Sequence, residues 1–359
     1  MDSTIRTRRD PKSTPKSDWA PALLKARRVP PLKVKKANDC CRSIDPGSRV
    51  TPVRIATRGS ELALAQAGAI AERIARELDR PSEIVVVTTT GDRIQEVSLA
   101  KIGGKGLFIK EIEQAILDDR ADVAVHSAKD LPAALAPGLV LASFPERADP
   151  RDALVVRGAA QTVSELPNGA RVGTGSTRRM AQLLSIRPDL QLVPMRGNVP
   201  TRLSKLESES LDALILACAG LDRLGRSAQI SERISTDLML PAVAQGTLAL
   251  QTRQDDPLIT DLRRLEDPKV SLATRAERRF LEELGGDCTI PLAGFCETLG
   301  EDSLRFRGWL SSANGEIVAR AEQEGPSGDP ETVGASVARA VLDAGGEQIL
   351  DQMRRGADA

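Results

Sequence analysis

The chain has 359 residues, of which 41% are hydrophobic and 28% are charged, a balance typical of a soluble globular protein with two or three domains. Aromatic residues make up 2% and tyrosine is absent, so the core must be aliphatic and stacked nucleic-acid bases are disfavoured as a ligand. No stretch of about 18 apolar residues occurs, which argues against a membrane span.

The formal net charge of zero conceals a strongly basic N-terminal segment. Residues 1–50 contain 13 Lys and Arg against 5 Asp and Glu, are rich in Pro, Ser and Thr, and show no helical or strand period. We therefore expect residues 1–50 to be a disordered basic extension. The segment lacks the apolar stretch of a secretory signal, and its acidic residues argue against a transit peptide without ruling one out. We expect a cytoplasmic protein.

The five cysteines follow no pattern of a disulfide framework or a metal site. Their odd number and the absence of CxxC spacing favour a reducing compartment, and we expect no bound metal. Cys218 and Cys296 lie in apolar or strand-like segments and are expected to be packed and inert. Cys288 follows a predicted helix end in a Gly-rich turn and is the one cysteine placed for chemistry. If this turn is considered without the rest of the chain, an unreactive buried thiol is the better interpretation.

From residue 53 onward, short apolar runs alternate with amphipathic stretches. Strands separated by helices predict a parallel or mixed sheet with crossover connections. We expect Ser60 to cap the first helix, and a polar Gly-containing loop at 91–106. The strands of this first unit are expected at 53–56, 84–88 and 123–125, and those of a second unit at 153–156, 170–172, 190–193 and 213–217.

The last ninety residues differ from the two preceding units. A helix is predicted over 272–284, a strand over 304–310, a hairpin turn at 314–315, and a closing helix over 331–353. The Pro/Gly break at 241–246 is expected to return the chain to the first unit. The predicted order of units is therefore α/β, α/β and a small α+β domain.

Three turns share one design, in which a strand, a few small residues and a helix start are joined by arginine. They lie at 56–60, 173–179 and 196–202. A helix N-terminus offers unpaired N–H groups, and an arginine fork grips a carboxylate at two points. Each turn alone is weak, since a single arginine near a helix start is more often a surface residue. Were all three to converge on one cleft, they would form a polyanion site, with carboxylate favoured because no phosphate-loop motif occurs.

The segment 122–132 reads DVAVHSAKDLP. Its apolar run ends in His126, Ser127, Lys129 and Asp130, and His126 is the only histidine of the chain. Open α/β sheets place ligand sites at strand ends of this kind. A solvated turn explains the segment equally well when it is taken alone.

Together these segments resemble the porphobilinogen deaminase (hydroxymethylbilane synthase) family over roughly residues 53–355. The matching motifs occur in order along the chain, and the ordered set is far more specific for the family than any single motif. They lie at 54–66, 101–113, 121–132, 172–179, 196–206, 219–225, 240–246 and 285–291.

The resemblance implies a transferase of tetrapyrrole, porphyrin and heme biosynthesis. Such an enzyme joins four porphobilinogen molecules head to tail, releases ammonia at each addition, and frees hydroxymethylbilane by hydrolysis. It implies a dipyrromethane cofactor attached by a thioether to Cys288. It also implies a monomer whose partner is this small-molecule substrate, and that the protein binds neither nucleic acid nor a membrane.

The implied fold has two α/β domains like periplasmic binding proteins and a small C-terminal α+β domain that carries the cysteine. We place domain 1 at 51–148 and 242–266, domain 2 at 149–241, and domain 3 at 267–359.

By motif match, Asp130 is the catalytic acid, expected to be fixed and buried between the reacting pyrroles, where it stabilises cationic nitrogens and moves protons. His126 is expected to orient its strand end rather than act as a base. Lys105 falls on the loop that resembles the family's flexible active-site cover. The residues implied for cofactor binding are Lys129, Thr174, Ser176, Arg178, Arg179 and Arg202, and those for substrate binding are Arg58, Ser60, Arg196, Asn198 and Arg223.

One departure from the family pattern is Asp287, which places a carboxylate directly before Cys288 and should raise the pKa of that thiol. Three other readings compete. A non-enzymatic anion receptor on the same scaffold would have no use for Cys288, a nucleic-acid binder would work through the basic extension, and a thiol hydrolase would need no porphobilinogen.

Overall fold

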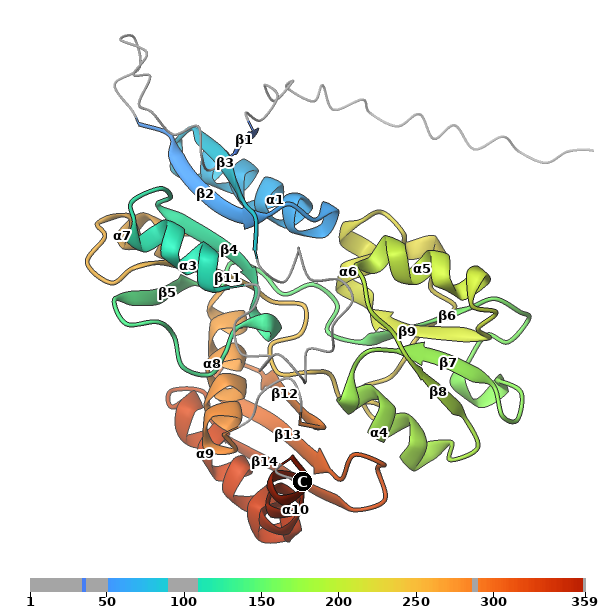
Figure 1. Cartoon of the computed structure of the whole chain (residues 1–359). Coiled ribbons are helices and arrows are strands. Elements are labelled where there is room, and N and C mark those ends of the chain that lie inside the picture. Colours follow the sequence, from blue (N-terminus) through green and yellow to red (C-terminus); the bar gives the residue numbers. More distant parts are fainter. Residues whose placement is uncertain (1–33, 37–50, 90–108, 286–289, 358–359) are drawn as a thin grey trace, which may run out of the picture. The chain divides into compact units, whose positions relative to one another are not determined.

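The computed structural model describes residues 34–36, 51–89, 109–285 and 290–357 (Figure 1). The chain divides into Met1–Pro31 and a unit Leu32–Ala359 that contains all of these residues. Lys105, Cys288 and the expected loop at 91–106 lie outside the described residues. No helix in the described part of the chain is long and apolar enough to cross a membrane.

The first sheet is mixed, as the alternation of strands and helices predicted. Its strand order is β1-β3-β2-β4-β11-β5, with β1 to β4 parallel and β11 antiparallel to both of its neighbours. Its strands are β1 (Val34–Lys36), β2 (Val53–Arg58), β3 (Ser82–Val87), β4 (Val123–Ser127), β5 (Leu139–Ser143) and β11 (Leu248–Arg253), and its helices are α1 (Glu61–Leu78), α3 (Lys110–Leu117), a 3-10 turn (Ala128–Asp130) and α7 (Leu258–Arg263).

Successive side chains along the strands of this sheet point to opposite faces, and each face packs against a different helix. Ile55 and Val123 pack with α1, whereas Ala56 and Ala124, one residue on, pack with α3. Successive strand residues point to opposite faces, so an apolar run without polar interruptions must be covered on both sides. The carboxyl ends of β2 and β4 therefore emerge from strands that helices cover on both faces.

The second sheet has the order β10-β6-β9-β7-β8 and is covered on both faces in the same way. Strand β7 is parallel to β8 and β9, and β6 is antiparallel to β9. Its strands are β6 (Asp152–Val156), β7 (Arg171–Thr174), β8 (Gln191–Pro194), β9 (Ala213–Ala217) and β10 (Glu232–Arg233), and its helices are α4 (Thr177–Ile186), α5 (Val199–Ser208), α6 (Cys218–Arg223) and 3-10 turns at Val163–Glu165 and Ser227–Gln229.

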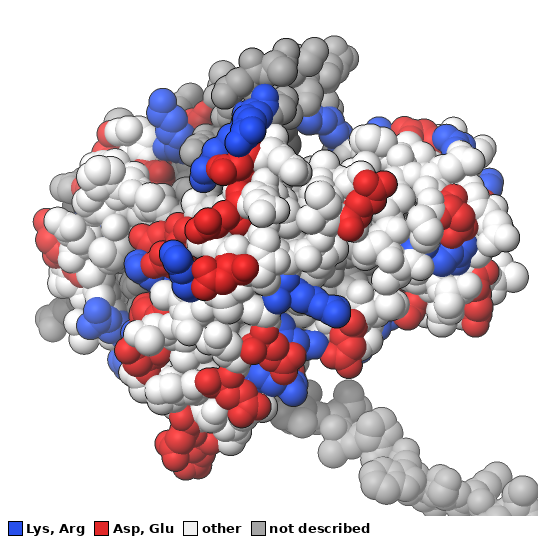
Figure 2. Space-filling model, turned by 90° about the horizontal axis from the view of Figure 1, so that it is seen from below, with Lys and Arg blue, Asp and Glu red and all other residues white. Residues whose placement is uncertain are grey.

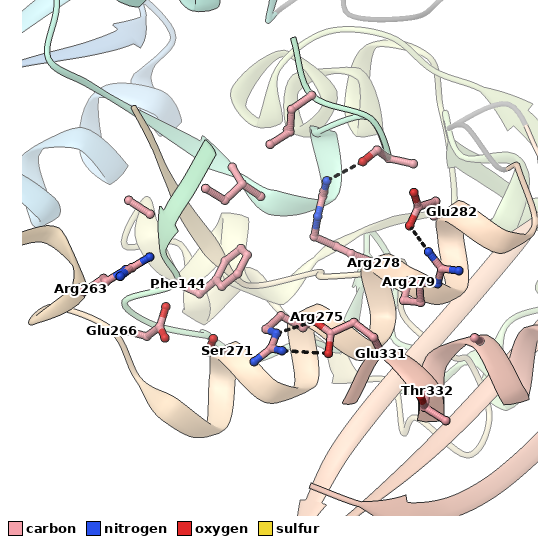
Figure 3. Close-up of a pocket in the computed structure, with 15 residues that line it drawn as sticks. Phe144, Arg263, Glu266, Ser271, Arg275, Arg278, Arg279, Glu282, Glu331 and Thr332 are labelled. Carbon is pink, nitrogen blue, oxygen red and sulfur yellow. Dashed lines mark hydrogen bonds and ion pairs between the residues drawn. The ribbon is translucent and has the colours of Figure 1, made fainter. Parts of the chain in front are cut away.

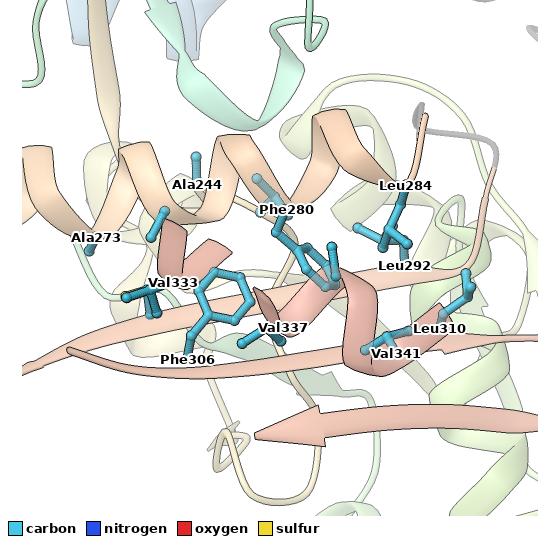
Figure 4. Close-up of a cluster of buried hydrophobic side chains, with 14 of the residues drawn as sticks. Ala244, Ala273, Phe280, Leu284, Leu292, Phe306, Leu310, Val333, Val337 and Val341 are labelled. Atoms are coloured by element: carbon cyan, nitrogen blue, oxygen red, sulfur yellow. The ribbon is translucent and has the colours of Figure 1, made fainter. Parts of the chain in front are cut away.

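The third sheet is an antiparallel meander, β12-β13-β14, packed against two helices. The Phe280 ring of α8 lies 5.0 Å from the Phe306 ring of β13, within the cluster shown in Figure 4. The elements are α8 (Pro268–Glu283), β12 (Leu292–Leu299), β13 (Ser303–Ser311), β14 (Val318–Pro326), α9 (Pro330–Val341), a π-helical turn (Leu342–Gly346) and α10 (Glu347–Ala357).

Two expectations need correction. The closing helix is not continuous over 331–353, because the chain breaks after α9 where Gly345 takes a φ of +107° that helical residues cannot adopt. Residues 34–36, within the segment expected to be disordered, form β1 and pair with β3. A strand at the edge of a sheet pairs through its main-chain groups. It therefore does not require the alternating side-chain pattern by which strands are predicted from sequence.

The fold class is α/β with a smaller C-terminal α+β unit, as predicted. The boundaries of the three domains stay a prediction. On the face seen in Figure 2, acidic and basic side chains are interspersed rather than gathered by sign.

Candidate active site

The three predicted strand–turn–helix junctions are present, at β2–α1, β7–α4 and β8–α5. A polar side chain caps each helix and satisfies an orphan N–H group of its first turn. Ser60 accepts from Ala63 N at 3.3 Å, Ser176 accepts from Arg179 N at 3.4 Å, and the Asn198 carbonyl oxygen accepts from Thr201 N at 2.9 Å. The prediction that Ser60 caps a helix is confirmed.

The three junctions meet at one cavity of about 170 Å³. Each contributes an arginine to its lining, from Arg58 at the first junction, Arg179 at the second and Arg202 at the third. The predicted site residues that line the cavity are Arg58, Ser60, Lys129, Asp130, Arg179, Arg202 and Arg223, and those that lie outside its lining are Thr174, Ser176, Arg178, Arg196 and Asn198.

Asp130 and Lys129 reach the cavity because β4 ends there in a 3-10 turn. Asp130 is exposed, so the expectation of a buried acid is wrong; it occupies the last position of the turn and faces away from the core. Lys129 is half-buried, and its ammonium donates to Gln245 Oε1 at 3.4 Å. Burial lowers the pKa of Lys129 to about 8, against the opposing pull of the Asp130 charge.

Asp152, the first residue of β6, holds the arginine pair of the second junction. Its fully buried carboxylate accepts from Arg178 Nη1 at 2.8 Å, from Arg179 Nη2 at 2.8 Å and from Gln245 Nε2 at 2.9 Å. Burial alone would raise the pKa of Asp152, but the charges of Arg178 and Arg179 outweigh it and hold the pKa well below its usual range.

The two neighbouring arginines therefore have different surroundings. Arg178 Nη1 also donates to Leu240 O at 2.6 Å and its side chain lies within the protein, whereas Arg179 reaches the cavity. Sequence reasoning missed Asp152. The one signal for it was a charged residue opening an otherwise apolar strand, which is unusual unless a partner is present.

Arg202 and Arg223 are anchored by main-chain carbonyls. Arg202 Nε donates to Gly197 O at 2.8 Å, and Arg223 Nη2 donates to Gly246 O at 2.8 Å and to Glu146 Oε1 at 3.0 Å. Burial lowers the pKa of both guanidinium groups; for Arg202, the charge of Arg179 lowers it further and that of Asp130 opposes. Desolvated guanidinium groups of this kind favour an anionic ligand.

Gly246 is required where Arg223 is anchored. Its φ is +88°, and a Cβ there would lie 2.4 Å from Ala148 O, so no other residue fits this backbone. Gly246 thus lets the returning chain pass directly against the outgoing one at the edge of the cavity.

His126 also lines the cavity but has a structural partner. Its Nε2 lies 2.9 Å from Gln251 Oε1, and Gln251 Nε2 donates to Glu113 Oε1 at 2.8 Å. Because the Gln251 amide must present its oxygen to the ring, Nε2 of His126 carries the proton. Burial lowers the pKa of His126 to about 4, so the ring is neutral at pH 7. These contacts support an orienting role and give no support to a base.

The remaining sequence candidates contribute little here. Cys218 and Cys296 are buried, and burial raises the pKa of Cys218 to about 12 and raises that of Cys296 as well, so both are inert as expected. Among the residues that the structure describes, no three His, Cys, Asp or Glu side chains are grouped so as to hold a metal ion.

A larger cavity, of about 680 Å³, lies elsewhere, between β5, α7, α8 and α9 (Figure 3). Its arginines are largely engaged within the protein: Arg275 pairs with Glu331 at 2.6 Å, and Arg279 pairs with Glu282 at 2.9 Å. None of the predicted site residues lines this cavity.

The smaller cavity therefore collects cationic side chains from strand–helix junctions of two sheets around one exposed carboxylate. Planar guanidinium groups at helix N-termini bind carboxylates well. The fold and the site together define an α/β protein built to hold a small molecule with several carboxylates.

Comparison with known proteins names the family. Residues 53–261 match the model of the porphobilinogen deaminase dipyrromethane cofactor binding domain, and residues 271–343 match that of the porphobilinogen deaminase C-terminal domain. The chain belongs to the porphobilinogen deaminase family, as its motifs predicted.

Curated relatives agree over most of the chain. The porphobilinogen deaminase of Syntrophus aciditrophicus is 46% identical over 85% of this chain and 99% of its own length, and that of Bacillus subtilis is 42% identical over 85% and 98%. Among solved structures, a substrate binding domain of a putative amino acid ABC transporter from Streptococcus pneumoniae covers 60% of this chain and 91% of its own, with 13% identity and a TM-score of 0.40.

Proposed function

We propose that this protein catalyses the porphobilinogen deaminase reaction. Four porphobilinogen molecules are condensed head to tail onto a covalently held dipyrromethane with release of ammonia at each addition, and water then cleaves the tetrapyrrole from the dipyrromethane to give hydroxymethylbilane. Membership of the family carries this proposal. The same membership disfavours the anion-receptor and thiol-hydrolase alternatives. We also propose a cytoplasmic monomer, with porphobilinogen as its small-molecule partner.

The residues present suit the carboxylate-bearing cofactor and substrate. Each pyrrole carries an acetate and a propionate, and the cavity lining supplies Arg58, Arg179, Arg202, Arg223 and Lys129. Guanidinium forks bind carboxylates with two parallel hydrogen bonds, and a partly desolvated site strengthens them. When bound, the dipyrromethane supplies the pyrrole from which the chain grows.

We assign Lys129, Arg179 and Arg202 to the cofactor carboxylates. Arg178 is assigned an indirect role: it shares the Asp152 carboxylate with Arg179 and so helps to hold that carboxylate in place. Thr174 and Ser176 belong to the same junction: Thr174 Oγ1 accepts from Ser176 N at 3.3 Å, which fixes the turn before α4. Cys288 is the proposed point of attachment.

Arg58, Ser60 and Arg223 are assigned to the incoming substrate. Arg196 and Asn198 belong to the third junction outside the cavity lining, and Asn198 holds the start of α5. Lys105 is proposed for the loop that covers the site. An entering carboxylate that binds Arg223 would compete with Glu146 for the same guanidinium.

Asp130 is the proposed catalytic residue. A carboxylate between two pyrroles stabilises positive charge that develops on their nitrogens, and it accepts and returns protons. The Asp130 carboxylate lies among the cationic side chains that line the cavity, which limits where a polycarboxylate can lie. Exposure to the cavity gives both rings access to it.

The test is the intact mass of the purified protein. We expect an excess equal to two condensed pyrrole units in the wild type and none in Cys288→Ser. Exchanging both Cys40 and Cys41 for serine is the matched control, because these residues precede the family match at residue 53. An unmodified yet active wild type would overturn the proposal.

Asp130→Asn separates the assignment of the acid from that of the cysteine. This variant should fold and carry the same mass excess, yet lose turnover by at least about 100-fold, the order expected for a lost proton-transfer group. Turnover within a few-fold of the wild type would show that Asp130 is not the catalytic residue.

A further inference from the structure

One arginine of α8 binds the chain that follows Asp130. Arg278 Nη2 donates to Pro132 O at 3.0 Å and to Ala133 O at 2.9 Å. Figure 3 shows Arg278 with one of these two hydrogen bonds as a dashed line. The residues from Pro132 to the start of β5 form neither helix nor strand. Irregular backbone must find hydrogen-bond donors outside regular structure, and here one guanidinium group supplies them to two successive carbonyls.

The residues on either side of Asp130 are held against the same helix. Ala128 and Leu131 are buried in the cluster that contains Phe280 of α8. Asp130 therefore lies between two apolar anchors, with the Arg278 clamp directly after the second. The exposed carboxylate at the end of the 3-10 turn is thereby flanked on both sides by residues that are held against α8.

The charge at this position is costly to keep. Arg278 Nη1 is buried with no hydrogen-bond partner among the described residues. A buried, unsatisfied donor of this kind destabilises a protein and calls for a functional explanation. The neighbouring arginines of the helix bear no such cost, since Arg275 and Arg279 pair with glutamates at the surface.

Helix α8 leads directly into the cysteine segment. It ends at Glu283, five residues before Cys288 in the sequence. One helix thus grips the segment of the proposed catalytic acid and also begins the approach to the proposed attachment point of the cofactor. We propose that Arg278 is a positioning residue that sets where Asp130 stands relative to this helix and so to the reacting pyrroles. The inference rests on the proposed function.

The experiment compares Arg278→Gln with Arg279→Gln, its neighbour on the same helix turn. Arg278→Gln should lower kcat by about 10-fold or more, because displacing a catalytic group by an ångström costs up to about 100-fold. KM should change less than about threefold, since the arginines that line the cavity are untouched. Arg279→Gln should leave both constants unchanged. Arg278→Lys keeps the charge and a donor, and should recover part of kcat.

Turnover is to be divided by the fraction of molecules that carry the cofactor mass, so that a loading defect is not mistaken for a positioning defect. A kcat for Arg278→Gln equal to that of Arg279→Gln would refute the inference, as would a loss confined to KM. If Arg278→Gln does not fold, Arg278→Lys decides: wild-type kcat refutes the inference, and a reduced kcat at unchanged KM supports it.

Asp130→Asn, measured alongside, distinguishes this inference from the proposed function. An inactive Asp130→Asn with a fully active Arg278→Gln would reject the positioning role alone. An active Asp130→Asn would reject the catalytic assignment, and the positioning role with it.

Discussion

Asp152 lies behind the lining of the cavity and His126 lies in it; both are buried, yet only Asp152 is charged at neutral pH. The difference lies in their partners. Asp152 receives two guanidinium groups, whose charges more than offset the loss of solvation, whereas His126 receives the neutral amide of Gln251. A buried group keeps its charge when an opposite charge is adjacent and gives it up otherwise.

His126 should make the free energy of unfolding depend on pH around the ordinary pKa of histidine. Its pKa is about 4 in the folded protein and about 6.5 when unfolded, so the unfolded state binds the proton first as the pH falls. The free energy of unfolding should therefore decrease by roughly 1 kcal/mol between pH 7.5 and 5.5. Urea denaturation at the two pH values measures it.

The control for this prediction is His126→Asn, in which the decrease should vanish. As this is the only histidine of the chain, no other one can mask the result. Equal stability of the wild type at both pH values would contradict the assigned burial.

At the scale of elements, α8 links the third sheet to the rest of the molecule. It is capped by Asp267, whose carboxylate accepts from Lys269 N at 3.0 Å and Val270 N at 3.2 Å. It crosses α9 so closely that a Cβ on Gly334 would lie 2.1 Å from Ala276 O. The crossing brings Phe280 into the core and leaves Arg278 facing the segment after Asp130.

Gly334→Ala should lower the free energy of unfolding by about 1–3 kcal/mol, because the added methyl group meets backbone that cannot turn aside. Chemical denaturation followed by circular dichroism measures the change. Gly328→Ala is the matched control, as nothing lies within 4 Å of a Cβ there and the site is exposed. Equal effects of the two substitutions would mean that the helices do not meet at Gly334.

At the scale of the whole molecule, one buried carboxylate joins the third sheet to both connections between the first and second sheets. Glu277 of α8 accepts from Arg147 Nη1 at 2.7 Å, from Cys296 N at 2.8 Å and from Ala244 N. Arg147 and Ala244 lie on the two connections between the first and second sheets, and Cys296 lies on β12. The contacts of Glu277 therefore hold the two connections between the first and second sheets against α8.

Glu277→Gln should lower the free energy of unfolding by about 3 kcal/mol or more, since it leaves the guanidinium of Arg147 buried without its counter-charge. The denaturant midpoint at pH 7.5 is the measurement. Glu282→Gln, on the same helix but exposed and paired with Arg279 at the surface, should cost less than about 1 kcal/mol. A loss as small for Glu277 as for Glu282 would contradict the buried pair.

The sequence by itself determined the features that depend on neighbours along the chain. The apolar runs at 123–125 and 213–217 became β4 and β9, and Ser60 caps α1 as expected. Hydrophobic periodicity and helix capping involve residues only a few positions apart, so they can be recognised from the sequence without knowledge of the fold. The ordered motifs were likewise sufficient for the family.

Tertiary structure alone decided which of the predicted residues come together. Arg178 and Arg179 are both buried and share the Asp152 carboxylate, yet only Arg179 lines the cavity. Their partner Asp152 lies 26 residues before Arg178 and 93 before Gln245, so no local pattern joins them. The exposure of Asp130 and the hydrogen bonds from Arg278 to the segment after it also arise from packing between distant segments. Side-chain direction in a close-packed interior is set by such contacts, and they exist only once the chain has folded.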